Sequence, residues 1–243
     1  MTGRNIKVTK LDQFLAEIRQ AQSKKQYLDI FQKFKFKLDQ EIPSDISSDY
    51  NQTLLHCAAV VDNVELAKAL IEAGANIDAP DHQECTPIYR AVSNSSINVL
   101  KILLKSGAST MPYPSIVSPL HIAVRRGFLP VAKLLISAKA DVRARDENGI
   151  EPIHYIGAGA LFNIHEGLCA MAAVDALTPD AFENDAEPEP EFKNLDLQCL
   201  KLLLNNGADV NATDSFGNNV LQLNATTRSS QLIKYLIKSG AQV

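Results

Sequence analysis

The sequence predicts an all-α repeat solenoid, in which short pairs of antiparallel helices stack along one axis. Two observations predict this fold class. The chain of 243 residues contains five copies of one pattern, in which two apolar residues, a lysine and a mostly apolar run precede a small-residue turn. The copies recur about every 33 residues, a period at which each repeat is one supersecondary unit. They lie at 66–75, 99–108, 131–140, 199–208 and 232–241.

The spacing of one leucine column sets the register of the repeats. Successive leucines are 33, 32, 68 and 33 residues apart, and 68 equals one period of 33 plus 35 inserted residues. The register is therefore kept across an insertion in the fourth repeat. The column consists of Leu70, Leu103, Leu135, Leu203 and Leu236.

A first helix is predicted to precede each of these runs, which form the second helices. Ser or Thr at its first position, as at Thr53, Thr86 and Ser118, can accept a hydrogen bond from an unpaired backbone N–H. Proline follows at Pro87 and Pro119 because the N–H that it lacks has no helical partner. The five openings are 53–56, 86–89, 118–121, 151–154 and 219–222.

Each second helix is predicted to end at a glycine in the left-handed conformation, which closes the helix C-terminus. The third repeat has Lys139 at this position. A residue with a Cβ costs about 1 kcal/mol in that conformation, so this exit is expected to be strained or differently shaped. The four glycines are Gly74, Gly107, Gly207 and Gly240.

The period and its motifs resemble the ankyrin repeat family. Residues 207–212 match the family's exit, Gly-Ala-Asp-Val-Asn-Ala, and 146–149 and 214–217 match its entry into the next repeat. The sequence departs from the family pattern at Asn51 and Glu84, where glycine is usual, and in the degenerate opening of the fifth repeat. The resemblance covers 48–243 and implies repeats at about 48–80, 81–112, 113–145, 146–213 and 214–243.

Residues 1–47 carry no ankyrin signature and predict a helical N-terminal cap. Apolar residues with helical spacing lie at 11–18 and at 27–38, and a capping-box pattern begins at Ser23. Without a cap, the first repeat would expose an apolar face. A basic membrane-surface helix around 33–37 is the alternative.

The insertion is predicted at 157–194. Its first half, to residue 177, is rich in small residues and is compatible with an extension of the first helix. Residues 178–191 carry six acidic side chains and three prolines, which favours a mobile acidic loop. A tolerated surface excursion is the simplest interpretation, because long loops add little entropic cost.

Composition excludes several classes of function. A net charge of -4 lacks the basic excess that nucleic-acid binding requires. Residues 1–10 lack the apolar core of a signal peptide, and no span approaches the roughly 18 apolar residues of a membrane helix. We therefore expect a cytoplasmic protein without a membrane span. Its four cysteines form no Cys-x-x-Cys pair, which indicates reduced thiols.

No catalytic motif is found, so we expect no enzyme activity, metal, cofactor or small-molecule substrate. His165 and Glu166 begin a partial zinc-protease pattern, but Cys169 replaces its second histidine. Residues 157–159 lack the rest of a phosphate-binding loop. The resemblance implies a structural role, linking adjacent loops by hydrogen bonds, for His56, His121 and His154.

The resemblance also implies where a partner binds. In the family, partners lie in a concave groove formed by the hairpin tips and the exposed end of each first helix. The corresponding residues are Tyr50, Gln52, Val60 and Val61 in repeat one, and His82, Gln83, Cys85, Ser93 and Asn94 in repeat two. They continue with Pro114, Ser115, Val117, Arg125 and Arg126 in repeat three, Glu147, Asn148 and Ile150 in repeat four, and Ser215 and Phe216 in repeat five.

Arginines concentrate near the third repeat, where Arg125 and Arg126 are expected to share the groove with Arg143 and Arg145. Four guanidinium groups favour an acidic or phosphorylated peptide, which they would pair in bidentate fashion. A solvated basic face is the alternative. The acidic residues 178–191 are a candidate internal competitor for the same site. Exposed Val60 and Val61 indicate an apolar contact, which Tyr50 and Phe216 would anchor at either end of the groove.

The sequence therefore predicts a scaffold or adaptor that binds another protein or a linear peptide. One alternative is a secreted bacterial effector, which would use the same groove in the host cytosol. An enzyme with chemistry in 157–194 or in a further domain is a second alternative. The last repeat leaves Leu232, Ile233 and Leu236 without a polar closing repeat, so a longer protein or a covering partner is expected there.

Overall fold

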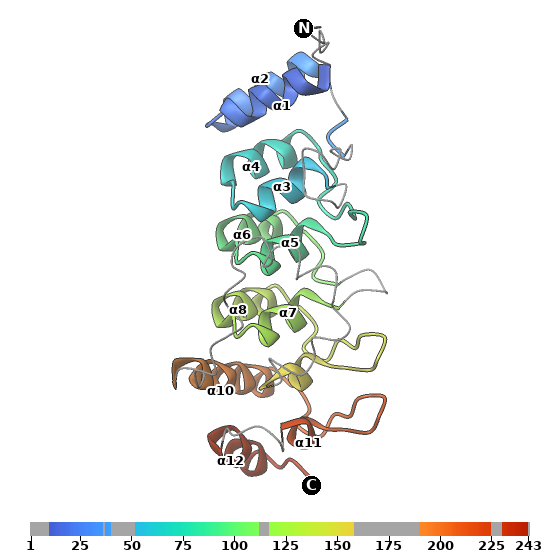
Figure 1. Ribbon diagram of the computed structural model, residues 1–243, viewed down its shortest axis with the longest axis vertical. Helices are drawn as coiled ribbons and strands as arrows, with labels where there is room; N and C mark the ends of the chain where they lie inside the picture. The colour runs from blue at the N-terminus through green and yellow to red at the C-terminus, as the bar shows by residue number, and fades with distance from the viewer. Residues whose placement is uncertain are drawn as a thin grey trace, which may run out of the picture.

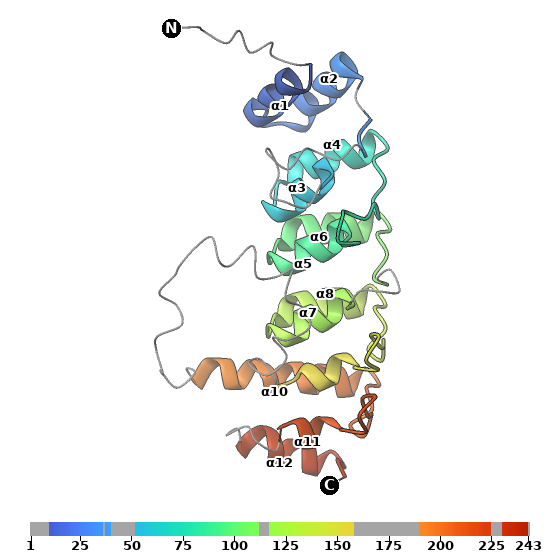
Figure 2. The ribbon, with the colours of Figure 1, turned by 45° about the vertical axis from the view of Figure 1, so that its right-hand side comes forward.

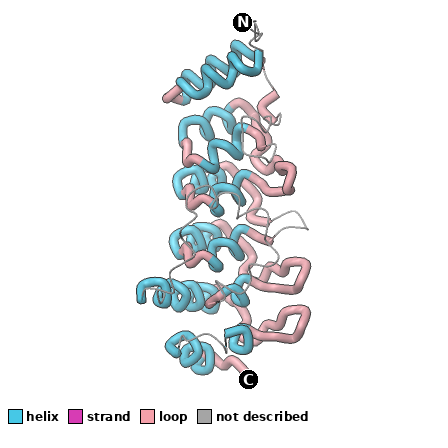
Figure 3. Tube along the Cα trace, in the orientation of Figure 1, coloured by secondary structure: helices cyan, strands magenta, loops and turns pink. Residues whose placement is uncertain are grey.

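A computed structural model shows a single stack of helix pairs that runs from the N-terminus to the C-terminus (Figure 1). The structure describes residues 10–35, 37–39, 52–111, 117–157, 190–224 and 230–242. Within these ranges the regular elements are all helical, as Figure 3 shows, and the one β-bridge joins Thr213 to Asn219. The predicted fold class, an all-α solenoid, is confirmed.

Each of the first three repeats is a pair of one short and one longer helix. The first helix has seven residues and the second has nine. In chain order these helices are α3 (Leu54–Val60), α4 (Val64–Glu72), α5 (Pro87–Ser93), α6 (Ile97–Lys105), α7 (Pro119–Arg125) and α8 (Leu129–Ser137). The equal lengths follow from the equal spacing of helix openings and left-handed exits along the sequence.

The helix exits confirm the predicted glycine positions. Gly74, Gly107, Gly207 and Gly240 all have φ close to +90°. Lys139 has φ +64°, so the third repeat uses the same left-handed exit and accepts the strain of a Cβ there.

The predicted role of the opening hydroxyls is wrong in two repeats. Thr86 and Ser118 begin α5 and α7 without a side-chain cap. The Ser118 hydroxyl instead lies 2.7 Å from Nδ1 of His121, one turn into the helix. The hydroxyl is therefore used to orient an imidazole.

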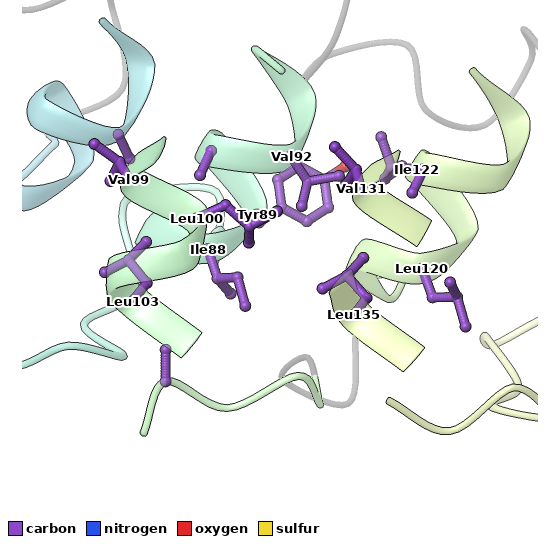
Figure 4. Packing of buried hydrophobic residues seen from close by; sticks show 14 of the residues in the cluster. Ile88, Tyr89, Val92, Val99, Leu100, Leu103, Leu120, Ile122, Val131 and Leu135 are labelled. Atoms are coloured by element: carbon purple, nitrogen blue, oxygen red, sulfur yellow. The ribbon is translucent and has the colours of Figure 1, made fainter. Parts of the chain in front are cut away.

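The core is a continuous layer of apolar side chains between successive helix pairs. Figure 4 shows this packing between repeats two and three, where side chains of α5 and α6 meet those of α7 and α8. Leu100 and Leu103 of α6 and Leu135 of α8 are fully buried. Burying a leucine contributes about 2 kcal/mol, so each repeat is stabilised mainly by its neighbours.

Two helices precede the first repeat, α1 (Lys10–Gln20) and α2 (Lys24–Phe34), at the blue end of Figure 1. Ser23 and Gln26 form the predicted capping box. The predicted apolar run to residue 38 is longer than the helix, because Lys35 turns left-handed at φ +52° and closes α2. Leu38 lies beyond the helix and still packs against the core.

The fourth repeat departs from the pattern. Its first element is only a four-residue 3₁₀ helix, η1 (Pro152–Tyr155), and its second is α10 (Pro190–Asn205), with 16 residues. Figure 2 shows α10 extending beyond the edge that the shorter helices share. Two helices complete the fifth repeat, α11 (Val220–Asn224) and α12 (Ser230–Lys238).

The predicted extension of the first helix into the insertion is therefore wrong as far as the structure describes it. The chain leaves η1 in an extended conformation at Ile156 and turns at Gly157, with φ +73°. The second helix extends backward instead, so 190–194 belong to α10. Proline is common at the first position of a helix, where α10 begins. Residues 158–189, including His165 and most of the acidic segment, lie outside the described residues.

Candidate protein-binding surface

The ends of the first helices form a regular row along one edge of the stack. Val61, Asn94 and Arg126 are the C-cap residues of α3, α5 and α7. Because the helices have equal length and stack in register, these three positions recur in successive repeats (Figure 1). Val61 is 68% exposed, which is unusual for an apolar residue beside a buried helix. The row is variable in chemistry, running from apolar through amide to cationic.

Hydrogen bonds between repeats hold this row in place. The guanidinium of Arg126 donates to the backbone carbonyl of Ser93, at the end of α5. One repeat earlier, the Ser96 hydroxyl donates to the carbonyl of Val60 at 3.4 Å. Each of these bonds satisfies a carbonyl that the helix end leaves unpaired. The predicted residues Val60 and Ser93 therefore contribute their backbone to the stack.

The loops between repeats project on one side of the stack, as Figure 2 shows. One aspartate builds each of three tips, because a single carboxylate oxygen accepts two backbone N–H groups. Asp146 Oδ1 accepts from Asn148 and Ile150, both at 2.9 Å. Asp81 and Asp214 do the same in their own loops, at distances of 2.8–3.0 Å. The tips are thus rigid platforms and not loose connections.

The exposed residues at these tips are chemically diverse. His82 and Glu147 are exposed, and Phe216 is 82% exposed. The loop tip that carries Phe216 contacts the preceding loop, because the backbone N–H and the hydroxyl of Ser215 both donate to the carbonyl of Asn148. Phe216 is therefore held outward on a supported loop.

Several predicted surface residues are not available to a partner. Gln52 is 3% exposed, and Cys85 and Ile150 are also buried. Cys85 and Ile150 follow the loop tips and already return to the core, so the predicted surface extends too far along each loop. Val117 is half-buried and packs against the core. Tyr50, Pro114 and Ser115 lie outside the described residues.

The predicted cluster of four arginines is divided into two pairs. Arg125 and Arg126 lie at the C-terminal end of α7, and Arg126 reaches back to the second repeat. Arg143 and Arg145 lie in the loop that leads to η1, and both pair with Glu151. Arg126 therefore contacts the second repeat, whereas Arg143 and Arg145 contact the start of the fourth.

Sequence reasoning missed a buried ion pair in the second repeat. Arg90 of α5 donates through Nε to Asp81 Oδ2 at 2.9 Å, and through Nη2 to Gln83 Oε1 at 3.0 Å. Both charged side chains are almost fully buried. The signal was the aspartate nine residues before an arginine on a short helix. The pair fixes the loop that carries His82, so the predicted residue Gln83 is a support and only partly exposed.

Burial shifts the pKa of several titratable groups in the described part of the chain. Burial lowers the pKa of His121 to about 4 and also lowers the pKa of His56. Burial raises the pKa of Cys57 to about 11 and that of Cys199 to about 12, so both thiols stay protonated at neutral pH. No group of three His, Cys, Asp or Glu residues in the described ranges could hold a metal ion. None of the helices described there has the length and apolar character needed to cross a bilayer.

Sequence models of one family match most of the chain. A model of three ankyrin repeats matches residues 19–112, a single-repeat model matches 117–147, and a model of many ankyrin repeats matches 194–241. The first match includes α2, in a segment where we expect no ankyrin signature from the sequence.

Individual relatives are similar to shorter parts of the chain. Alpha-latrotoxin-Lg1a of Latrodectus geometricus is 29% identical over 123 residues, which are 48% of this chain and 9% of the toxin. Neurogenic locus notch homolog protein 1 of Xenopus tropicalis is 30% identical over 143 residues, which are 58% of this chain and 6% of that protein. The B-cell lymphoma 3 protein homolog of Mus musculus is 31% identical over 140 residues, which are 57% of this chain and 29% of that protein.

The chain thus spans less than a third of the length of each of these relatives. What it shares with them is the repeat, and repeats of this kind generally serve as protein-interaction modules without catalytic activity. The stacked helix pairs, the glycine exits and the three family matches agree, and the chain belongs to the ankyrin repeat family.

Proposed function

We propose that this protein is a scaffold that binds a partner protein through two rows of residues, the first-helix ends and the loop tips, which lie at opposite sides of the helix stack (Figure 3). The observation that carries the proposal is the exposure of Val61 and Phe216, two large apolar side chains on otherwise well-buried repeats. Exposed apolar residues on rigid supports are favourable anchors, because little entropy is lost when a partner covers them.

The arrangement of the surface supports extended contact with a protein. The C-cap position of the first helix recurs in three successive repeats and carries Val61, Asn94 and Arg126. The three rigid loop tips carry His82, Glu147 and Phe216. Arg126 is half-buried and bonds to Ser93, whereas the other five side chains are exposed and do not fill the core. Their chemistry can therefore vary with the partner while the repeats stay folded.

Capture of partners from an extract of the source cells tests the proposal. We expect Val61→Asp combined with Phe216→Ala to lower the amount of captured partner at least about tenfold, as loss of two anchor residues does. Both positions are exposed, so thermal unfolding of the double variant should match that of the wild type. The measurement is quantitative mass spectrometry of proteins retained on the immobilised full chain.

The second helices provide the matched control. Lys101 and Lys133 are exposed on α6 and α8, in the lysine column of the repeats. The variant Lys101→Ala with Lys133→Ala should retain its partners. Equal loss in both double variants, or no loss in the Val61 and Phe216 variant, would refute the proposed binding surface.

A further inference from the structure

Two half-exposed guanidinium groups surround one buried carboxylate at the start of the fourth repeat. Glu151, the N-cap of η1, is 1% exposed. Its Oε1 accepts from Arg145 Nε at 3.1 Å, and its Oε2 lies 3.9 Å from Arg143 Nε. The side chains of Arg143 and Arg145 are 51% and 53% exposed. The buried charge holds both guanidinium groups at the surface.

Most of the N–H donors in this pair remain unused by the described residues. Arg145 donates through Nε alone, which leaves its two terminal nitrogens to solvent. Arg143 makes ion pairs at 3.8 and 3.9 Å, distances beyond a hydrogen bond. A guanidinium has five N–H donors in a planar fork that fits a carboxylate in bidentate fashion. The unused donors are therefore suited to an external carboxylate.

The position of Arg143 is occupied by a hydrogen-bond acceptor in repeats one and four, whereas repeat two has Met111 there. In the same column, Asp78 accepts from the backbone N–H of Ser109, and Asn211 accepts from that of Gln242. Each bond ties one repeat to the next. An arginine side chain cannot accept, so Arg143 cannot make this bond and instead lies 3.8 Å from the Asp209 carboxylate of the following repeat. Arg143 therefore contacts the next repeat through this long ion pair and not through a hydrogen bond.

We propose that Arg143 and Arg145, held by Glu151, bind a carboxylate of an acidic segment in the partner protein. This inference rests on the proposed scaffold function and names the chemistry of one contact within it. Exposed acidic side chains at Asp141, Glu147 and Asp209 flank the pair. These carboxylates repel a dense polyanion, so the arginine pair suits only isolated carboxylates that are spaced along a peptide.

Fluorescence anisotropy with a labelled peptide of alternating glutamate and glycine tests this contact on the full chain. We expect Arg143→Gln with Arg145→Gln to weaken binding at least about tenfold, because two charge-assisted pairs are lost. The control, Lys101→Gln with Lys133→Gln, also removes two positive charges, here from α6 and α8, and should bind the peptide as the wild type does. A peptide of alternating glutamine and glycine should not bind.

Removing both arginines strands the buried Glu151 and endangers folding. A triple variant that adds Glu151→Thr removes this charge and restores the threonine that opens the first two repeats, as at Thr53 and Thr86. It should fold and still fail to bind. The variant Arg143→Lys with Arg145→Lys keeps the charge but loses the planar fork, and it should bind about fivefold more weakly.

Four outcomes would overturn the assignment: no binding of the glutamate peptide to the wild type, equal weakening in the lysine-column control, unchanged binding in the Arg→Lys variant, or binding retained in the triple variant. A matching phosphoserine peptide that binds more than about tenfold tighter would assign the pair to phosphate instead. If the wild type retains its protein partners but not the glutamate peptide, this contact is wrong and the scaffold function stands.

Discussion

Single side chains in the histidine column connect the repeats. In His56, His121 and His154, Nε2 lies 2.8–2.9 Å from a carbonyl oxygen in the next loop. A carbonyl can only accept, so Nε2 carries a proton and donates it in each of these bonds. Nδ1 then accepts from the residue that opens the same helix, as in His56 with the Thr53 N–H. The structural role implied for these histidines is confirmed by these contacts.

The neutral state of His121 predicts acid sensitivity. Its pKa is about 4 in the folded protein against 6.5 when unfolded. Between these values only the unfolded state binds the proton, so stability falls as the pH falls from about 7 to 4. The loss attributable to this group is about 3 kcal/mol. His56, whose pKa is also lowered, adds to it.

The variant His121→Gln isolates this contribution in urea unfolding at several pH values. Glutamine suits the column, because Gln222 accepts from the Asn219 N–H in repeat five. The variant should be less stable at pH 7 and lose about 3 kcal/mol less on acidification. Burial raises the pKa of Asp196 to about 6, so protonation of this carboxyl favours the folded state as the pH falls below 6. This effect is the same in the wild type and the variant, so it cancels when their pH profiles are subtracted. Parallel pH profiles would contradict the prediction.

At the scale of elements, one close approach decides the shape of the fourth repeat. A Cβ on Gly157 would lie 2.1 Å from Asn224 Oδ1 and 2.9 Å from a Leu232 methyl. The Asn224 amide in turn donates to the carbonyl of Ile156 at 2.7 Å. The chain after η1 therefore passes directly against α11 and α12. A longer first helix would not allow this path.

Replacing Gly157 with alanine should be strongly destabilising, by about 3 kcal/mol or more, because the methyl group has no space and φ is positive. Gly207→Ala is the matched control. Gly207 has φ +92° with nothing within 4 Å of an added Cβ, so only the backbone strain of about 1 kcal/mol remains. Denaturant unfolding of both variants measures the difference. Equal losses would show that the close approach carries no energy.

At the scale of the whole molecule, contacts between adjacent repeats carry the stability. Helix pairs pack on their neighbours, and the loops are tied in sequence by the histidine, aspartate and asparagine side chains described above. Stability in such a stack is a sum over repeats and their interfaces. The first three repeats have first helices of seven residues, whereas the fourth and fifth have elements of four and five.

Hydrogen exchange should therefore divide the chain at the fourth repeat. Backbone amides of α11 and α12 should exchange at least about tenfold faster than those of α5 to α8. The short elements η1 and α11 bury less surface than the seven-residue first helices, so the end of the stack opens more easily. Mass spectrometry of peptides from the exchanged protein measures this directly. Uniform protection from α3 to α12 would mean that the stack opens as one unit.

The sequence by itself determined the repeat. The 33-residue period, the helix pairs and the exits at Gly74, Gly107, Gly207 and Gly240 follow from local preferences, which each segment carries wherever it lies. The N-terminal pair of helices and the register across the insertion were predictable for the same reason. The exposure of Val61 and Phe216 was also predictable, because repeat register alone places these residues at a helix end and a loop tip.

Only the tertiary structure decided which neighbours the polar side chains meet. It divided the arginines between Ser93 and Glu151, buried Gln52, and set the backward extension of α10 into the insertion. These outcomes depend on residues one repeat away or, for Gly157 and Asn224, on the far side of the insertion. The partner of a long polar side chain depends on the distance to neighbouring groups and on how deeply they are buried. Both quantities are set only when the repeats stack.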